Sequence, residues 1–308
     1  MDQYVRDFNQ FLQESPDLPI AVNAIRTLVK LLQASKATTM MELRDQLQEL
    51  IQAMVDKSGN STLSLSSGCQ LFMSFGTRAE SFDSVEHSKV RLIERAKIFI
   101  QKATDSRKKI ATLGNPFIRD GATILTHSRS RVVEKLLLEA AAANKRISVF
   151  MTESRPDGSG YIAAEQLRAA GIPVTMILDA AVGHIIGKVD LVLVGAEGVV
   201  ESGGIVNKIG TYQLAIVAKV ANKPFYAVAE SFKFVRMYPL SQYDLPVQSD
   251  NAAPFYPSIV PTQANSTELK FLNPSVDYTP PAYISLLFTD LGVLTPSAVS
   301  DQLILLYT

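Results

Sequence analysis

Three polar segments of the chain follow apolar runs and hold the side chains best suited to chemistry. They are 126–129 (THSR), 152–158 (TESRPDG) and 195–215 (GAEGVVESGGIVNKIGTYQLA). If each apolar run is a strand of a parallel sheet, the segments lie at the carboxyl ends of the strands, where open α/β sheets bind ligands. The sequence therefore predicts one crevice. Its candidate ligand-binding residues are Ser128, Arg129, Arg155, Glu197, Asn207 and Lys208.

The residue types in this crevice favour an anionic ligand. Arg129, Arg155 and Lys208 are cationic, and a guanidinium suits bidentate contacts to phosphate. Gly203, Gly204 and Lys208 also precede a predicted helix, whose free N–H groups and dipole attract anions. The alternative is that the glycines only make a turn and Lys208 only solvates the helix start. A sugar phosphate or nucleotide monophosphate fits better than a dinucleotide, because neither G-x-G-x-x-G after the first strand nor a P-loop is present.

For two further polar residues, His127 and Asp179, we favour a structural role over a role in binding or catalysis. His127 ends a buried strand and is expected to be a packing residue whose ring nitrogens are hydrogen-bonded. His127 and Ser128 cannot form a triad, because adjacent strand residues point to opposite faces. Asp179 follows a strand, where it could bind a sugar hydroxyl, but we expect it to cap the next helix.

The elements that position these residues alternate along the second part of the chain. The predicted strands are 122–126, 146–152, 173–178, 189–194, 225–229 and 284–289, and the predicted helices are 130–143, 160–170, 180–187, 210–221 and 296–306. Such alternation predicts an α/β fold, with a Rossmann-like parallel sheet covered by helices on both faces. Residues 237–282 are rich in proline, serine, asparagine and aspartate, and predict an extended loop region.

The first part of the chain has helical periodicity throughout. A stripe of Leu43, Leu47, Leu50 and Met54 follows Thr39-Met-Met-Glu42, which is a capping-box pattern, and a loop is expected at 58–61. We therefore expect a helical domain over 1–112 and the Rossmann-like α/β domain over 113–308.

Composition excludes several classes of protein. Of the 308 residues, 47% are hydrophobic, which is enough for a real core, and the formal net charge of zero argues against general nucleic-acid binding. The one cysteine, Cys69, and three scattered histidines give no zinc-ligand spacing, and nothing indicates a cofactor. Without a signal-peptide pattern or a membrane-length apolar run, we expect a cytosolic protein.

Six segments together resemble a known family. They are 24–32, 120–130, 152–160, 173–183, 194–211 and 228–234, with a seventh match at the C-terminus over 288–303. They are similar to the related subunits of eukaryotic translation initiation factor 2B, and to the alpha branch most closely, because no long extension precedes the helical part.

The resemblance implies a regulatory role and no catalysis of exchange. A member of the alpha branch would form a homodimer that joins two sets of the beta, gamma, delta and epsilon subunits. It would also help to sense the phosphorylated alpha subunit of initiation factor 2, by a surface that we place near Thr39, Glu42 and Arg44. Capping alone is the competing explanation for Thr39 and Glu42.

The same segments also resemble sugar-phosphate isomerases that act on ribose-1,5-bisphosphate or methylthioribose-1-phosphate. The resemblance implies a catalytic cysteine where this chain has Ser128 and a catalytic aspartate where it has Glu197. A serine hydroxyl is a far weaker acid than a thiol, and the added methylene of glutamate displaces the carboxylate. We therefore expect a ligand pocket without turnover; an active isomerase is the alternative.

Overall fold

The structure is a computed structural model of the 308-residue chain, and it describes residues 2–57, 62–76, 84–245 and 274–307. The loop predicted at 58–61 and most of the proline-rich region lie outside these residues. None of the described helices is both long and apolar enough to span a membrane.

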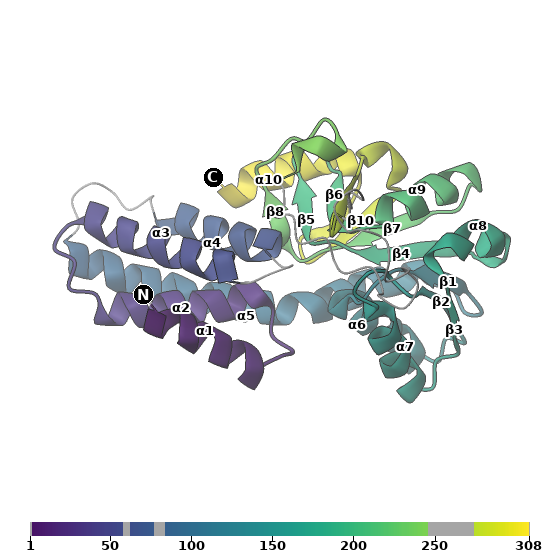
Figure 1. The fold of residues 1–308 in the computed structure, drawn as a ribbon, viewed down its shortest axis with the longest axis horizontal. Coiled ribbons are helices and arrows are strands. Elements are labelled where there is room, and N and C mark those ends of the chain that lie inside the picture. Colours follow the sequence, from purple (N-terminus) through teal and green to yellow (C-terminus); the bar gives the residue numbers. More distant parts are fainter. Residues whose placement is uncertain (1, 58–61, 77–83, 246–273, 308) are drawn as a thin grey trace, which may run out of the picture.

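Five helices form the first part of the molecule, as the periodicity predicts (Figure 1). They are α1 (Asp2–Glu14), α2 (Ile20–Ala34), α3 (Met40–Lys57), α4 (Thr62–Gly76) and α5 (Val85–Gly114). The helix α2 is central and packs against the other four, and buried residues lie around most of its circumference. On α3 the predicted stripe of Leu43, Leu47, Leu50 and Met54 is buried.

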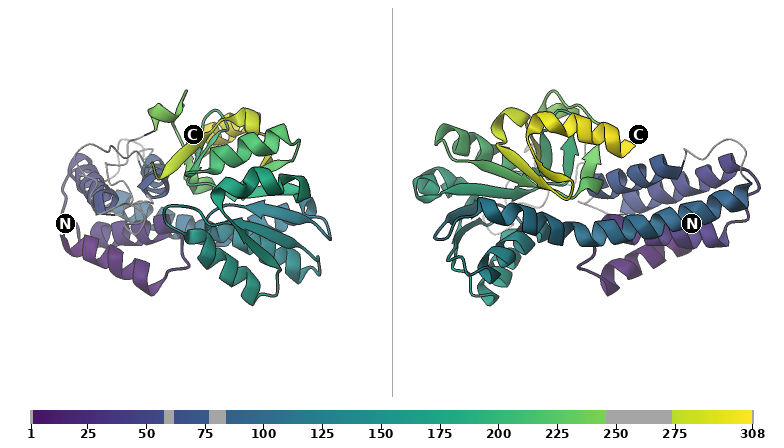
Figure 2. Two further views of the ribbon diagram at one scale, coloured as in Figure 1. Left: turned by 45° about the vertical axis from the view of Figure 1, so that its right-hand side comes forward. Right: turned by 180° about the vertical axis from the view of Figure 1, so that it is seen from behind.

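The helix α5 belongs to both parts of the molecule. It has 30 residues, so it is about 45 Å long, and the right-hand view of Figure 2 shows it running from the helical bundle to the sheet. Its first half packs in the bundle, whereas Ile110 and Ala111 belong to the core beneath the sheet. The helix α5 thus contributes to two separate core clusters, and a domain boundary at residue 112 stays a prediction.

Seven strands form the main sheet, and their order confirms the predicted α/β class. They are β1 (Thr123–Thr126), β2 (Ser148–Thr152), β3 (Val174–Ile177), β4 (Leu191–Gly195), β7 (Phe225–Val228), β10 (Leu286–Thr289) and β11 (Gly292–Leu294). Their order is β11-β10-β7-β4-β1-β2-β3, and every pairing is parallel except β10 with β11. The chain adds strands in opposite directions from β1 and from β4, so the topological switch point lies between these two strands.

Helices cover both faces of this sheet, as expected. Alternate strand residues, such as Ile124 and Leu193, pack beneath α5, α6 (Arg131–Ala142) and α7 (Ser159–Ala169). Their neighbours Leu125 and Val192 pack on the other face, with α8 (Val182–Ile185) and α9 (Thr211–Val220). The last helix, α10 (Val299–Tyr307), lies beside α4 in Figure 1 and contacts it.

A second, smaller sheet corrects two expectations from the sequence. Its strands are β5 (Gly198–Val200), β6 (Ile205–Lys208), β8 (Phe234–Val235) and β9 (Val276–Thr279), in the order β8-β5-β6-β9. The segment between the predicted strand 189–194 and the predicted helix 210–221, where no strand was expected, contains the β5–β6 hairpin, and β9 lies within the region expected to be extended loop. These strands have two to four residues, too few to show an alternating pattern. Two of them, β8 and β9, also come from parts of the chain distant from the β5–β6 hairpin.

A buried ionic cluster joins α5 to the sheet. Glu230, directly after β7, accepts a hydrogen bond from Arg107 Nε of α5 at 3.0 Å and lies 2.9 Å from Lys233 Nζ. Only 2% of the Glu230 side chain is exposed. Burial alone would raise the pKa of Glu230, but Lys233 and Arg107 together outweigh burial and lower the pKa to about 2.

Candidate functional site

The predicted crevice lies at the carboxyl ends of β1, β2 and β4, beside the topological switch point. The loop after β1 carries Ser128 and Arg129, the loop after β2 carries Arg155, and Glu197 follows β4. Asn207 and Lys208 come from β6 of the smaller sheet, which lies above β4 in Figure 1. The structure therefore brings the three polar segments to one edge, as the sequence predicts.

His127 is a packing residue, as expected. Its ring is buried, with Nδ1 2.6 Å from Thr152 Oγ1 and Nε2 2.8 Å from the carbonyl oxygen of Ile209. Burial lowers the pKa of His127, and the nearby Asp179 carboxylate only partly opposes this effect. The imidazole thus ties the ends of β1, β2 and β6 together.

Ser128 turns the chain out of β1 towards α7. Its φ of 61° places it in the left-handed region, and its Oγ lies 2.9 Å from Ser159 Oγ in the first turn of α7. The next residue of α7, Gly160, packs so closely on β2 that a Cβ there would overlap the carbonyl oxygen of Thr152. The position of Ser128 therefore depends on this close approach.

The two arginines of the site have carboxylate partners of their own. Arg129 Nε lies 3.5 Å from Glu134 Oε1 of α6, and Arg155 Nε lies 3.2 Å from Glu153 Oε2. About half of the Arg155 side chain is exposed. Both guanidinium groups are at the rim of the crevice, and an anionic ligand would have to compete with these carboxylates.

Asp179 does not cap the following helix, so that expectation is wrong. Its two carboxylate oxygens instead accept hydrogen bonds from the backbone N–H groups of Ser154 and Arg155, at 2.9 and 2.7 Å. The N-cap of the following 3-10 turn, Leu178, has no side-chain cap. Asp179 thus fixes the loop after β2, because the loop presents two free N–H groups to the end of β3.

A lysine between two acids lies at the centre of the crevice. Lys208 Nζ is 3.5 Å from Asp157 Oδ2 and 3.8 Å from Glu197 Oε1. Burial raises the pKa of Glu197, while Lys208 and Lys233 oppose the rise. The second carboxylate oxygen of Glu197, Oε2, is buried without a hydrogen-bond partner among the described residues. The crevice therefore offers a cation and an unused carboxylate oxygen side by side, which suits a ligand with both phosphate and hydroxyl groups.

The N-terminus of α9 is already occupied by a side chain. Asp277 Oδ2, from β9, accepts hydrogen bonds from the N–H groups of Gly210 and Tyr212 at 2.8 and 3.0 Å. Asn207 is buried and donates to Thr211 Oγ1 at 3.0 Å. The predicted anion site at this helix terminus is therefore filled by Asp277, although Lys208 beside it still faces the crevice.

The glycine pair does not line the crevice. Gly203 and Gly204 make the turn between β5 and β6, where the N–H of Gly203 donates to the carbonyl of Val200. A Cβ on Gly203 would overlap the carbonyl of Pro296, and one on Gly204 would lie 2.5 Å from the Tyr278 ring. The alternative interpretation, that these glycines make a turn, is correct.

The buried carboxyl group of Asp277 should make the stability of the folded chain depend on pH. Burial raises the pKa of Asp277 to about 7, although its two N–H donors oppose the rise. A raised pKa favours the protonated folded state, so this contribution is complete below about pH 4 and is lost as the pH rises towards 7. We expect the unfolding free energy of Asp277→Asn, relative to wild type, to increase by roughly 3 kcal/mol between pH 4 and 7 in urea titrations. A difference that does not change with pH would contradict this assignment.

Comparison with known proteins identifies the family. Residues 13–296 match the family described as "Initiation factor 2 subunit family". The chain belongs to the initiation factor 2 subunit family. It is 48% identical to the translation initiation factor 2B subunit alpha of Dictyostelium discoideum over 99% of this chain and 97% of that relative.

Other similar proteins are more distant. A ribose 1,5-bisphosphate isomerase of Archaeoglobus fulgidus is 37% identical over 70% of this chain and 67% of that enzyme. A chain in the crystal structure of the tetrameric initiation factor 2B beta2-delta2 complex from C. thermophilum superposes with a TM-score of 0.74. It is 19% identical and covers 98% of this chain and 94% of that one, so it shows a shared fold.

The sensing residues predicted for this member of the initiation factor 2 subunit family lie far from the crevice, at the start of α3 (Figure 1). All three are exposed. Thr39 Oγ1 accepts from the N–H of Glu42 at 3.2 Å, and Glu42 Oε2 accepts from the N–H of Thr38 at 3.0 Å. Capping thus accounts for Thr39 and Glu42 structurally, with the return bond one residue earlier than in a capping box, whereas Arg44 has no such role.

Three residues of the site region were not among the candidates chosen from the sequence. Asp277 lies within the proline-rich region, 67 residues after its partner Gly210, so no local pattern connects them. Ser159 was visible only as part of the segment after β2, and its contact with Ser128 depends on α7 packing. Asp157, the second acid beside Lys208, could have been found in the sequence, because it is an acidic residue in the same segment after β2 as the cationic Arg155.

Proposed function

We propose that this chain is the alpha subunit of translation initiation factor 2B, a regulatory subunit of the guanine-nucleotide exchange factor for initiation factor 2. The observation that carries the proposal is the 48% identity to an alpha subunit over nearly the full length of both chains. In this role the chain forms a homodimer that joins two sets of the beta, gamma, delta and epsilon subunits. It does not catalyse exchange itself, and it works in the cytosol.

The second element of the proposal is that the chain helps to sense the phosphorylated alpha subunit of initiation factor 2. The surface that we assign to sensing consists of Thr39, Glu42 and Arg44 at the start of α3. Its exposure supports the proposal, because these side chains cover no part of the bundle core. Arg44 is the most informative of the three, since its replacement leaves the cap of α3 intact.

Reconstitution of the exchange factor tests both elements. We expect this chain to increase the mass of the particle formed by the other four subunits to that of a double assembly. We also expect GDP release from initiation factor 2 to become sensitive to phosphorylation of its alpha subunit, and Arg44→Glu to weaken that sensitivity. Lys135→Glu, an exposed charge reversal on α6, is the matched control. Equal mass and equal inhibition with and without the chain would overturn the proposal.

We further propose that the crevice retains a sugar phosphate or nucleotide monophosphate without turning it over. The similarity to ribose 1,5-bisphosphate isomerase and the position of Lys208 between the strand ends support binding. Ser128 and Glu197, where the enzymes are inferred to have cysteine and aspartate, support the absence of turnover. Calorimetry with ribose 1,5-bisphosphate should show binding by wild type that Lys208→Ala weakens. Product formation that is lost in Glu197→Ala would instead establish the alternative, an active isomerase.

A further inference from the structure

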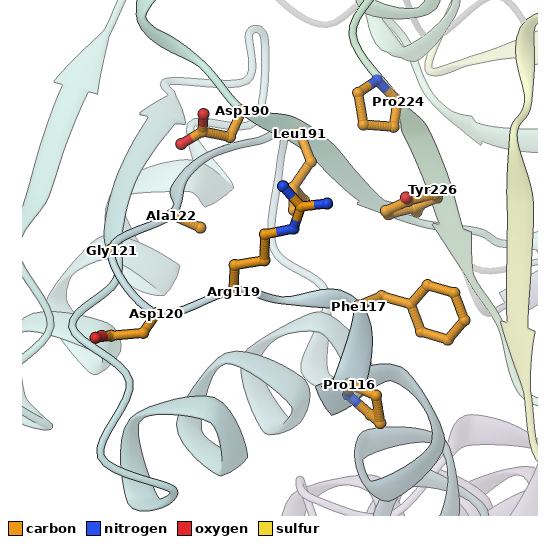
Figure 3. Close-up of a pocket in the computed structure, with 10 residues that line it drawn as sticks. All are labelled: Pro116, Phe117, Arg119, Asp120, Gly121, Ala122, Asp190, Leu191, Pro224 and Tyr226. Atoms are coloured by element: carbon orange, nitrogen blue, oxygen red, sulfur yellow. The ribbon is translucent and has the colours of Figure 1, made fainter.

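A hollow with a volume of about 590 Å³ opens at the amino ends of β1, β4 and β7, at the edge of the sheet opposite the crevice (Figure 3). The loop 116–122 after α5, the start of β4 and the start of β7 line it. Cavities of a few hundred to 1,000 Å³ are the size that holds small molecules. Neither the proposed function nor the crevice makes use of this hollow.

Arg119 supplies a free positive charge in the hollow. Its guanidinium points into the space between Leu191 and Tyr226 in Figure 3. No described residue makes an ion pair or a side-chain hydrogen bond with it. The adjacent Asp120 turns away from the hollow and pairs with Arg146, whose Nε lies 3.2 Å from Asp120 Oδ1. The charge of Arg119 is therefore available to a ligand.

Asp190 supplies a negative charge on another side of the same hollow. Its Oδ2 accepts a hydrogen bond from the N–H of Thr123 at 2.7 Å, which fixes the carboxylate at the start of β4. Its Oδ1 has no hydrogen-bond partner among the described residues, and Asp190 and Arg119 form no ion pair with each other. Two residues of opposite charge thus line the hollow, and no ion pair joins them.

Apolar rings form the remaining wall. The rings of Phe117 and Tyr226 meet edge to face, with centroids 6.2 Å apart and an interplanar angle of 73°. Phe117 is 37% exposed, and Pro116 and Pro224 extend the same wall. An exposed aromatic wall of this kind packs well against a flat or branched apolar group.

We propose that this hollow binds a free α-amino acid with an aromatic or large aliphatic side chain. The ligand's carboxylate pairs with Arg119, its ammonium group pairs with Asp190, and its side chain packs against Tyr226 and Phe117. A zwitterion can pair with both Arg119 and Asp190 at once, whereas a simple anion or cation would leave one of these two charges without a partner.

Titration calorimetry of the full chain with L-phenylalanine tests the proposal. We expect wild type to bind with a Kd of about 1 mM or lower, and Arg119→Gln and Asp190→Asn each to weaken binding at least about tenfold. Two analogues separate the contacts. 3-Phenylpropionate lacks the ammonium group, so its weaker binding should be insensitive to Asp190→Asn, and phenethylamine lacks the carboxylate, so its binding should be insensitive to Arg119→Gln.

The variants are chosen so that folding is preserved. Arg119 is exposed and forms no ion pair with any residue that the structure describes, and asparagine at 190 keeps an oxygen for the N–H of Thr123. Lys208→Ala, at the other edge of the sheet, should bind L-phenylalanine like wild type, which distinguishes this hollow from the crevice. No binding by wild type at about ten times the expected Kd, or binding by both hollow variants that is as tight as that of wild type, would overturn the proposal.

Discussion

Replacing Glu230 with glutamine is expected to lower the free energy of unfolding by about 3–5 kcal/mol. Glutamine has nearly the same shape, so the change removes the charge and leaves the cavity filled. Arg107 and Lys233, whose side chains are each 16% exposed, then keep their charges in a buried site without a counter-ion. Breaking a buried ion pair on one side is costly for that reason, even where the intact pair adds little net stability.

Urea unfolding followed by circular dichroism measures this effect, with Asp7→Asn as the matched control. Asp7 pairs with Lys30 at 2.9 Å on the surface, where such pairs contribute about 0.5 kcal/mol. Because the folded pKa of Glu230 is lowered from 4.5 to about 2, its contribution is complete above pH 4.5 and is lost as the pH falls towards 2. The difference between wild type and Glu230→Gln should therefore shrink over that range. A midpoint shift no larger than that of Asp7→Asn would contradict the prediction.

Replacing Gly160 with alanine is expected to destabilise the chain by about 3 kcal/mol and to disturb the crevice. The added Cβ would overlap the carbonyl oxygen of Thr152, which belongs to β2 and cannot move without breaking its parallel pairing. The start of α7 has to retreat instead, and with it Ser159, which contacts Ser128. Thermal and urea unfolding measure the loss of stability.

The control for Gly160 is another helical glycine with open space around it. A Cβ on Gly183, in α8, would meet no heavy atom within 4 Å. Gly183→Ala should therefore be neutral or stabilise the fold by about 0.5–1 kcal/mol, because alanine restricts the unfolded chain. If Gly160→Ala unfolds at the same urea concentration as Gly183→Ala, the proposed overlap with β2 does not limit stability.

The main sheet, apart from β11, and its helices were predictable because apolar runs alternate with helical patterns along the chain. The strand β4 contains the apolar run 191–194, and Ser130 marks the start of α6 as its N-cap. The smaller sheet was not predictable. Its strand β5 has three residues and pairs in parallel with β8, more than thirty residues later, so its pairing is a property of the folded chain.

The candidate site was predictable in position but less so in detail. Parallel topology fixes which loops meet, and the loops carrying Ser128, Arg155 and Glu197 do meet. The partner of each polar group depends on distances of a few ångströms, which the sequence does not encode locally. Asp179 was therefore expected to cap the helix that follows it, yet its carboxylate accepts hydrogen bonds from the N–H groups of Ser154 and Arg155 on the neighbouring loop.

The long separation between Asp277 and α9 has a consequence for synthesis of the chain. Gly210 precedes Asp277 by 67 residues, and a ribosome adds about 5–20 residues per second. The first turn of α9 is therefore synthesised roughly 3–13 s before Asp277, whose carboxylate accepts hydrogen bonds from the N–H groups of that turn. Over this interval β6 also lacks β9, the strand that pairs with its outer edge in the folded protein. A nascent chain stalled before Asp277 should expose that edge to a chaperone or to another nascent chain, and the exposure should end when β9 leaves the exit tunnel.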